Sequence, residues 1–147
     1  MGDATIRVTD TLKGTRYHAV VEDDLRVAYA YLYDGERAVG QVWLYNRGPA
    51  PRDMNEPTWR EGPYRNAAPW ASNNDCPPIS GAADVQFIWR IVRGVSVLIR
   101  IHGVDWAVLR FGAIPGWCRL ARRANPLALP LSELPPDAEV PEIRDGR

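Results

Sequence analysis

The part of the chain that most constrains its fold is residues 84–111, where apolar and polar side chains alternate between glycine-containing turns. A period of two residues is that of a β-strand that buries one face. His102-Gly103 suits a two-residue hairpin loop, and residues 93–95 suit a three-residue loop. The segment is therefore predicted to form a three-stranded antiparallel meander.

The two loops also predict which residues of the meander face each other. The loop at 102–103 places Arg100 opposite Asp105, and the loop at 93–95 places Trp89 opposite Ile99. A slip of one residue would divide the large apolar side chains between two faces, so the register is well specified. The predicted core face consists of Phe87, Trp89, Ile91, Val97, Ile99, Ile101, Val104, Trp106 and Val108.

Residues 5–46 show the same alternation in shorter runs, predicted as strands at 5–12, 15–21, 25–33 and 37–46. Residues 13–14 are predicted to be a two-residue turn, and residues 34–36 a three-residue loop. One face of the second hairpin is aromatic and carries Tyr29, Tyr31, Tyr33, Trp43 and Tyr45. The other face carries small apolar residues, which suits the close approach of another layer.

The rest of the chain is less regular. Residues 47–83, which are rich in proline, are predicted to form a long irregular loop, and residues 115–124 have the proline and arginine placement of a short helix. A proline-rich acidic tail follows at 125–147. The predicted fold over residues 1–147 is one mostly β domain, an antiparallel two-sheet sandwich or strongly curved sheet of about seven strands with one short C-terminal helix.

Charge and composition exclude several classes of protein. The 18 basic and 18 acidic residues cancel, which argues against nucleic-acid binding. Residues 85–123 hold seven arginines against the single acid Asp105, yet the predicted register turns the tryptophans away from them. No basic leader precedes an apolar run, and no apolar stretch reaches membrane-spanning length. We therefore expect a cytoplasmic protein that binds neither nucleic acid nor membrane.

The residues that usually carry chemistry do not form a catalytic or metal-binding pattern. His18 lies in a predicted strand and His102 in a turn, and neither has further ligands at metal-binding spacing. Cys76 and Cys118 are not spaced with a base, and Asp23-Asp24 suits a turn. No catalytic residue, metal or cofactor is predicted, so we expect the chain not to be an enzyme.

The long loop at 47–83 has the composition of a binding segment. It holds seven prolines, two tryptophans and a tyrosine, and a loop of this length in a compact domain is usually functional or disordered. Trp, Tyr and Arg dominate interface energetics. The competing interpretation is that the loop folds back and covers the sheet. The predicted partner-binding residues are Arg52, Trp59, Arg60, Tyr64, Arg65, Trp70, Tyr31 and Tyr33.

Two segments carry a resemblance, YLYDGERAVGQVWLYN at 31–46 and DWAVLRFGAIPGWCRLARRANPLALPL at 105–131. With its size and aromatic content, the chain resembles small bacterial immunity proteins encoded with polymorphic or secretion-system toxins. The resemblance implies tight binding to a cognate protein toxin, whose active site would be blocked. Two alternatives are a small-ligand or carbohydrate-binding β-module, which would use the aromatic face, and an enzyme of unrecognised type.

Overall fold

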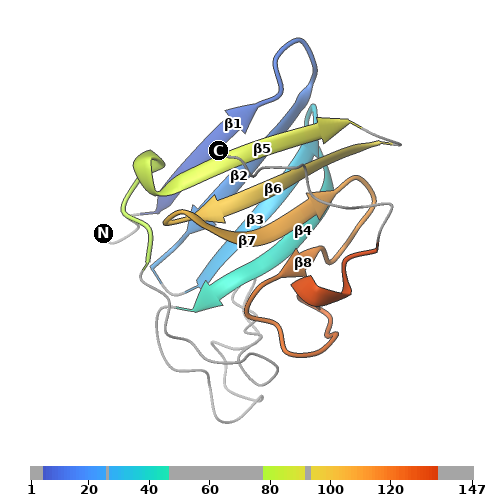
Figure 1. Ribbon diagram of the computed structural model, residues 1–147. Helices are drawn as coiled ribbons and strands as arrows, with labels where there is room; N and C mark the ends of the chain where they lie inside the picture. The colour runs from blue at the N-terminus through green and yellow to red at the C-terminus, as the bar shows by residue number, and fades with distance from the viewer. Residues whose placement is uncertain (1–4, 26, 47–77, 92–93, 136–147) are drawn as a thin grey trace.

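The computed structural model describes residues 5–25, 27–46, 78–91 and 94–135, which form two β-sheets packed as a sandwich (Figure 1). The first sheet has the order β1-β2-β3-β4, with strands at Ile6–Thr11, Tyr17–Asp23, Val27–Asp34 and Arg37–Asn46. The second has the order β5-β6-β7-β8-β9, with strands at Val85–Ile91, Val95–Ile101, Val104–Arg110, Trp117–Cys118 and Leu129–Pro130. The predicted mostly β, two-sheet architecture is confirmed.

The first hairpin has a wider loop than the predicted two-residue turn. Thr11 pairs with His18, so the loop extends over residues 13–16. The Thr15 hydroxyl donates to the Leu12 carbonyl oxygen at 2.8 Å and accepts the Tyr17 N–H at 3.0 Å. These side-chain bonds add to the backbone bond that the Thr15 N–H donates to the Leu12 carbonyl oxygen at 3.1 Å.

The β3–β4 hairpin keeps most of its predicted faces but not its predicted register. Asp34 pairs with Arg37 across a two-residue loop, instead of the three-residue loop expected. Two register shifts follow along the ladder, and the second places Tyr45 opposite Ala28. Tyr45 therefore lies on the core side, and its assignment to the aromatic face was wrong.

The meander is confirmed, with two corrections to its register. Arg100 lies opposite Asp105 as predicted, but a bulge beside it pairs Ile99 with Ala107. Beyond this bulge Leu109 points into the core and Val108 points outward, the reverse of the prediction. In the β5–β6 pair every residue lies opposite a partner two positions away from the predicted one, so Trp89 faces Val97 instead of Ile99. Because side chains alternate with a period of two, this displacement leaves each side chain on its predicted face.

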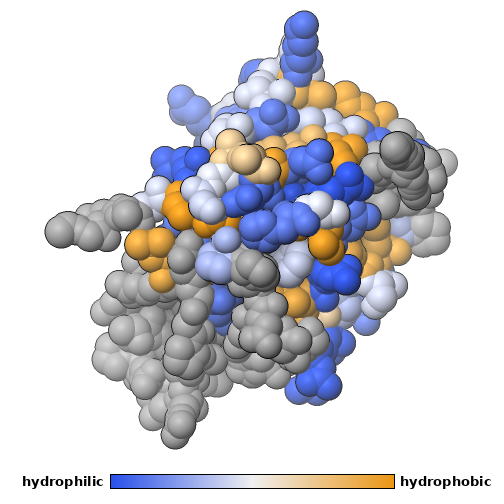
Figure 2. All heavy atoms as spheres, turned by 60° about the vertical axis from the view of Figure 1, so that its left-hand side comes forward, coloured by the Kyte–Doolittle hydropathy of each residue, from blue (hydrophilic) through white to orange (hydrophobic). Residues whose placement is uncertain are grey.

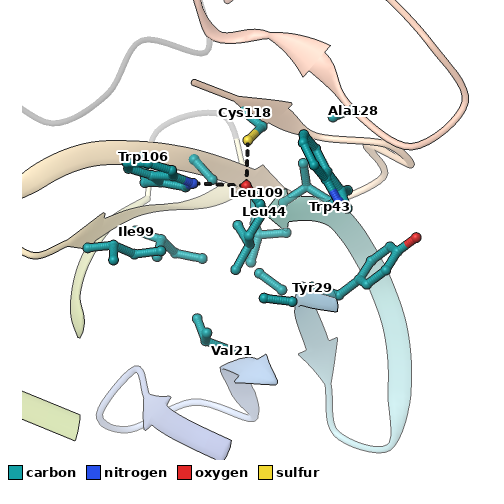
Figure 3. Packing of buried hydrophobic residues seen from close by; sticks show 14 of the residues in the cluster. Val21, Tyr29, Trp43, Leu44, Ile99, Trp106, Leu109, Cys118 and Ala128 are labelled. Atoms are coloured by element: carbon teal, nitrogen blue, oxygen red, sulfur yellow. Dashed lines mark hydrogen bonds between the residues drawn. The ribbon is translucent and has the colours of Figure 1, made fainter. Parts of the chain in front are cut away.

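The core lies between the two sheets. Its fully buried side chains include Val21, Leu32, Leu44, Ile79, Ile99, Ile101 and Leu109 (Figure 3). Trp106 points into this layer, and its indole N–H donates to the Leu44 carbonyl oxygen at 3.1 Å. Phe87 and Trp89 are only half-buried, because β5 is an edge strand.

The predicted helix at 115–124 is absent, and this stretch forms β8 followed by turns. Two of its backbone N–H groups bond to neighbouring strands: Gly116 donates to the Gln41 carbonyl oxygen at 2.7 Å and Arg119 to that of Trp106 at 2.7 Å. A Cβ on Gly116 would collide with the Val108 carbonyl oxygen, so only glycine permits this approach. Tertiary hydrogen bonds outweigh the local helix signals.

The segment after β7 also closes the open side of β4. Gly112 donates to the Val39 carbonyl oxygen at 2.7 Å, and the Trp43 N–H donates to that of Leu127 at 3.0 Å. Gly40 lies beneath this segment, where an added Cβ would come within 3.0 Å of the Arg110 carbonyl oxygen. Within the described residues, no helix is long and apolar enough to cross a membrane.

Candidate partner-binding face

The outer face of the β1–β4 sheet carries the predicted residues that the structure describes. Because side chains alternate along a strand, Tyr29, Tyr31 and Tyr33 of β3 share this face. The register places His18 of β2 opposite Tyr33 and Glu22 opposite Tyr29. We call His18, Glu22, Tyr29, Tyr31, Tyr33 and Gln41 the tyrosine face.

The rings of the tyrosine face stack on one another. His18 and Tyr33 are nearly parallel, with an interplanar angle of 11° and centroids 5.0 Å apart. The ring centroid of Tyr31 lies 6.2 Å from those of both Tyr29 and Tyr33. The interplanar angle is 15° with Tyr29 and 42° with Tyr33. In the two stacked pairs, His18 with Tyr33 and Tyr29 with Tyr31, each ring therefore turns one face toward its neighbour.

The exposed fraction of each aromatic side chain decides which rings a partner could reach. Tyr29 is 6% exposed and Trp43 is fully buried. The Trp43 indole N–H donates to the Asn46 side-chain oxygen at 2.9 Å, which fixes the ring in place. Tyr31, Tyr33 and His18 are half-buried, so they form the accessible part of the tyrosine face.

Charged groups border the rings. Arg7 of β1 lies opposite Glu22 and forms an ion pair with it, in which the Arg7 Nε lies 3.0 Å from Oε2. Burial raises the pKa of Tyr31 to about 12, with a further contribution from Glu22. The Tyr31 hydroxyl is therefore neutral at physiological pH and can donate a hydrogen bond.

A buried polar junction at one end of the sheet was missed by sequence reasoning. The Tyr45 hydroxyl donates to Asp23 Oδ2 at 2.5 Å and accepts the Ile79 N–H at 3.1 Å. Asp23 Oδ1 also accepts the Leu25 N–H at 2.8 Å. The junction joins β2 and β4 to residues just before β5. Asp23 is fully buried, so its role is structural.

The other candidates of the sequence analysis divide into two groups. Six predicted partner-binding residues lie outside the described residues: Arg52, Trp59, Arg60, Tyr64, Arg65 and Trp70. Cys118 is buried, and its thiol lies 3.5 Å from the Leu44 carbonyl oxygen. His102 occupies the hairpin turn with φ 51°, and its Nδ1 lies 3.6 Å from Asp84 Oδ1. In the described part of the chain, no three His, Cys, Asp or Glu side chains gather as a metal site.

A cavity of about 290 Å³ lies at the end of the sandwich beside the β5–β6 loop, lined by Tyr17, Gly94, Val95, Arg110 and Phe111. Tyr17 and Phe111 meet edge to face, with ring centroids 6.3 Å apart. On the side of the molecule that Figure 2 brings forward, hydrophobic and hydrophilic residues are interspersed. The cavity is a candidate small-ligand site, separate from the tyrosine face.

Comparison of the chain with protein-family models, curated proteins and solved structures finds no match.

Proposed function

We propose that this chain is a protein-binding inhibitor, and specifically an immunity protein that binds a cognate bacterial toxin and blocks its active site. The observation that carries the proposal is the row of half-buried rings on the outer face of the first sheet, in which His18 stacks on Tyr33 and Tyr31 lies tilted beside Tyr33. Tyrosine is enriched at protein interfaces because its ring supplies contact area and its hydroxyl a hydrogen bond. The resemblance noted in the sequence supplies the more specific assignment to a toxin.

The ring geometry favours a protein partner over a sugar. A ligand that stacks needs an open aromatic face, whereas His18 already stacks on Tyr33 and Tyr31 on Tyr29. What they offer is a row of polar edges, bordered by the Arg7–Glu22 ion pair. Such a row suits the mixed polar and apolar surface of a protein.

The proposal assigns no catalysis and no cofactor to this chain. The toxin would be met in the cytoplasm, and the arginines and aromatics of residues 52–70 would extend the contact beyond the tyrosine face. Anchors of this type typically cost about 2 kcal/mol or more on truncation, roughly a thirtyfold loss of affinity.

The test compares two variants of the tagged chain in its native organism. Capture of partners by the wild-type chain is compared with capture by Tyr31→Ala/Tyr33→Ala and by Arg122→Ala, an exposed residue elsewhere. A single protein enriched by the wild type and by Arg122→Ala, but at least tenfold weaker on the double variant, supports the proposal. The enriched protein should also be toxic when expressed alone, and equal capture by all three chains contradicts the assigned face.

The cavity supports a second candidate function, the binding of a small ligand. Its volume of about 290 Å³ is at the lower end of the range for ligand sites. A ligand that occupies it should raise the melting temperature of the wild type but not of Phe111→Ala. A library of small molecules screened against both chains tests this directly.

A further inference from the structure

In the described part of the chain, the outer edge of β5 is an unpaired strand edge without the sequence features that usually protect one. Within the described residues, β5 pairs with β6 on one side and with no strand on the other. Edge strands are usually protected by proline, bulges or inward-pointing charges. Residues 85–91 contain no proline or glycine, their ladder has no register shift, and Arg90 is their one charged residue.

The edge strand β1 of the first sheet differs from β5 in this respect. β1 carries Asp10 on its inward side, where the carboxylate accepts the Trp89 indole N–H at 2.7 Å. Its outward side carries Arg7 and two threonines. An inward-pointing charge is one of the devices that discourage pairing with a further strand, so β1 is protected where β5 is not.

The direction of the β5 backbone groups follows from one hydrogen bond beyond the strand. The His102 N–H donates to the Asp84 carbonyl oxygen at 2.9 Å, and the register of β5 continues this pair without a shift. In an antiparallel ladder, bonded and non-bonded pairs alternate. Residues 86, 88 and 90 therefore bond to β6, and the odd-numbered residues direct their N–H and C=O groups outward.

The sequence of β5, VQFIWRI, is self-complementary about its centre. In an antiparallel pair of two such strands centred on Ile88, Phe87 faces Trp89 and Gln86 faces Arg90. Val85 faces Ile91, which is 62% exposed in one chain. Every pair then joins an apolar residue to an apolar one, or a polar residue to a polar one, on the same side of the sheet. Centring on Phe87 or Trp89 instead would place Ile88 against Gln86 or Arg90.

We propose that two copies of this chain associate through antiparallel pairing of their β5 strands, with the two-fold axis at Ile88. The outward N–H and C=O groups of residues 85, 87, 89 and 91 bond across the interface, and the two second sheets become one continuous sheet. The pairing is isologous, as a two-fold dimer requires. It leaves the tyrosine face of each copy open. The dimer and the proposed function can therefore be tested independently, and failure of one does not imply failure of the other.

A disulfide tests the register directly. On the axis, Ile88 faces its own copy in a non-hydrogen-bonded pair, where Cα atoms lie about 4.5 Å apart and a disulfide can form. In a Cys76→Ser background, Ile88→Cys should give a disulfide-linked dimer under mild oxidation. The matched control Gln86→Cys, which faces Arg90, should stay largely unlinked although it is more exposed. Linkage of Gln86→Cys alone, or equal linkage of both, would overturn the register.

Two substitutions at Gln86 test the association itself in the unlinked chain. By light scattering and sedimentation, the wild type should approach twice the chain mass of 16.5 kDa as concentration rises. Gln86→Lys sets like charges opposite Arg90 at two symmetric positions and should raise Kd roughly 2- to 30-fold, whereas Gln86→Glu should lower it. A wild type that is monomeric up to about 1 mM, or a dimer indifferent to both changes, would refute the proposal.

Discussion

His18 and Tyr33 lie directly opposite each other on β2 and β3, with nearly parallel rings whose centroids are 5.0 Å apart. This contact makes the imidazole part of the sheet's packing. His18 is consequently held in the tyrosine face by its stacking contact with Tyr33.

The stack predicts a coupling energy between the two rings. Aromatic pairs contribute about 0.5–1.5 kcal/mol beyond the area that they bury. His18→Ala and Tyr33→Ala should therefore be non-additive by about that amount in urea unfolding. Additivity within experimental error would show that the rings contribute independently.

Trp106→Ala should be strongly destabilising. The side chain is buried and its indole N–H bonds to the Leu44 carbonyl oxygen, so truncation leaves a cavity and should cost about 3–5 kcal/mol. Trp89→Ala is the control, because that ring is half-buried and should cost less. A Trp106→Ala protein with an unchanged melting midpoint would contradict the packing of β7.

Tyr45→Phe isolates the buried junction with Asp23. The substitution keeps the ring but removes the hydroxyl that donates to Asp23 Oδ2 at 2.5 Å. Loss of a hydrogen bond to a buried charged group should cost about 1.5–3 kcal/mol. Tyr33→Phe, on the half-buried tyrosine face, is the matched control and should cost less.

Gly116→Ala should destabilise the fold although only one methyl group is added. The new Cβ would collide with the Val108 carbonyl oxygen, and an overpacked core costs about 1–3 kcal/mol. Gly81 has open space around it and extended backbone, with φ 174°. Gly81→Ala should therefore leave the free energy of unfolding, measured by chemical denaturation, unchanged. Equal effects at the two sites would contradict the close contact between Gly116 and the Val108 carbonyl oxygen.

Tyr31 gives a prediction for alkaline pH. Its pKa in the folded chain is raised from 10.0 to about 12, so the unfolded chain loses this proton first. The contribution of Tyr31 to stability is complete below pH 10 and is lost as pH rises toward 12. The wild type should thus lose more stability over this interval than Tyr31→Phe, and parallel curves would exclude the raised pKa.

Some of this architecture could be predicted from residue patterns because side-chain direction in a strand repeats every two residues. The faces of β5 and β6 were right although each partner was displaced by two residues. The bulge beside Trp106 could not be predicted, since it reverses Val108 and Leu109 without a local sequence signal. The helix expected at 115–124 failed because its N–H groups bond to β4 and β7.

The candidate site divides in the same way. Tyr31 and Tyr33 could be assigned to one face from their spacing, and the structure places both on the outer face. The depth of Tyr29 and Trp43 could not be predicted, because it depends on packing from other parts of the chain. The Asp23–Tyr45 contact joins residues 22 positions apart. Nothing in the local sequence around either residue indicates that the two side chains meet.

The hydrogen bonds that β4 makes with Gly112, Gly116 and Leu127 also set an order of events during synthesis. Strands β1 to β4 leave the ribosome well before these partners. Until the later segment emerges, the outer N–H and C=O groups of β4 therefore lack their hydrogen-bond partners. We therefore expect the domain to complete its fold late, and a nascent chain arrested before Gly112 to be the species most prone to pair with the wrong strand.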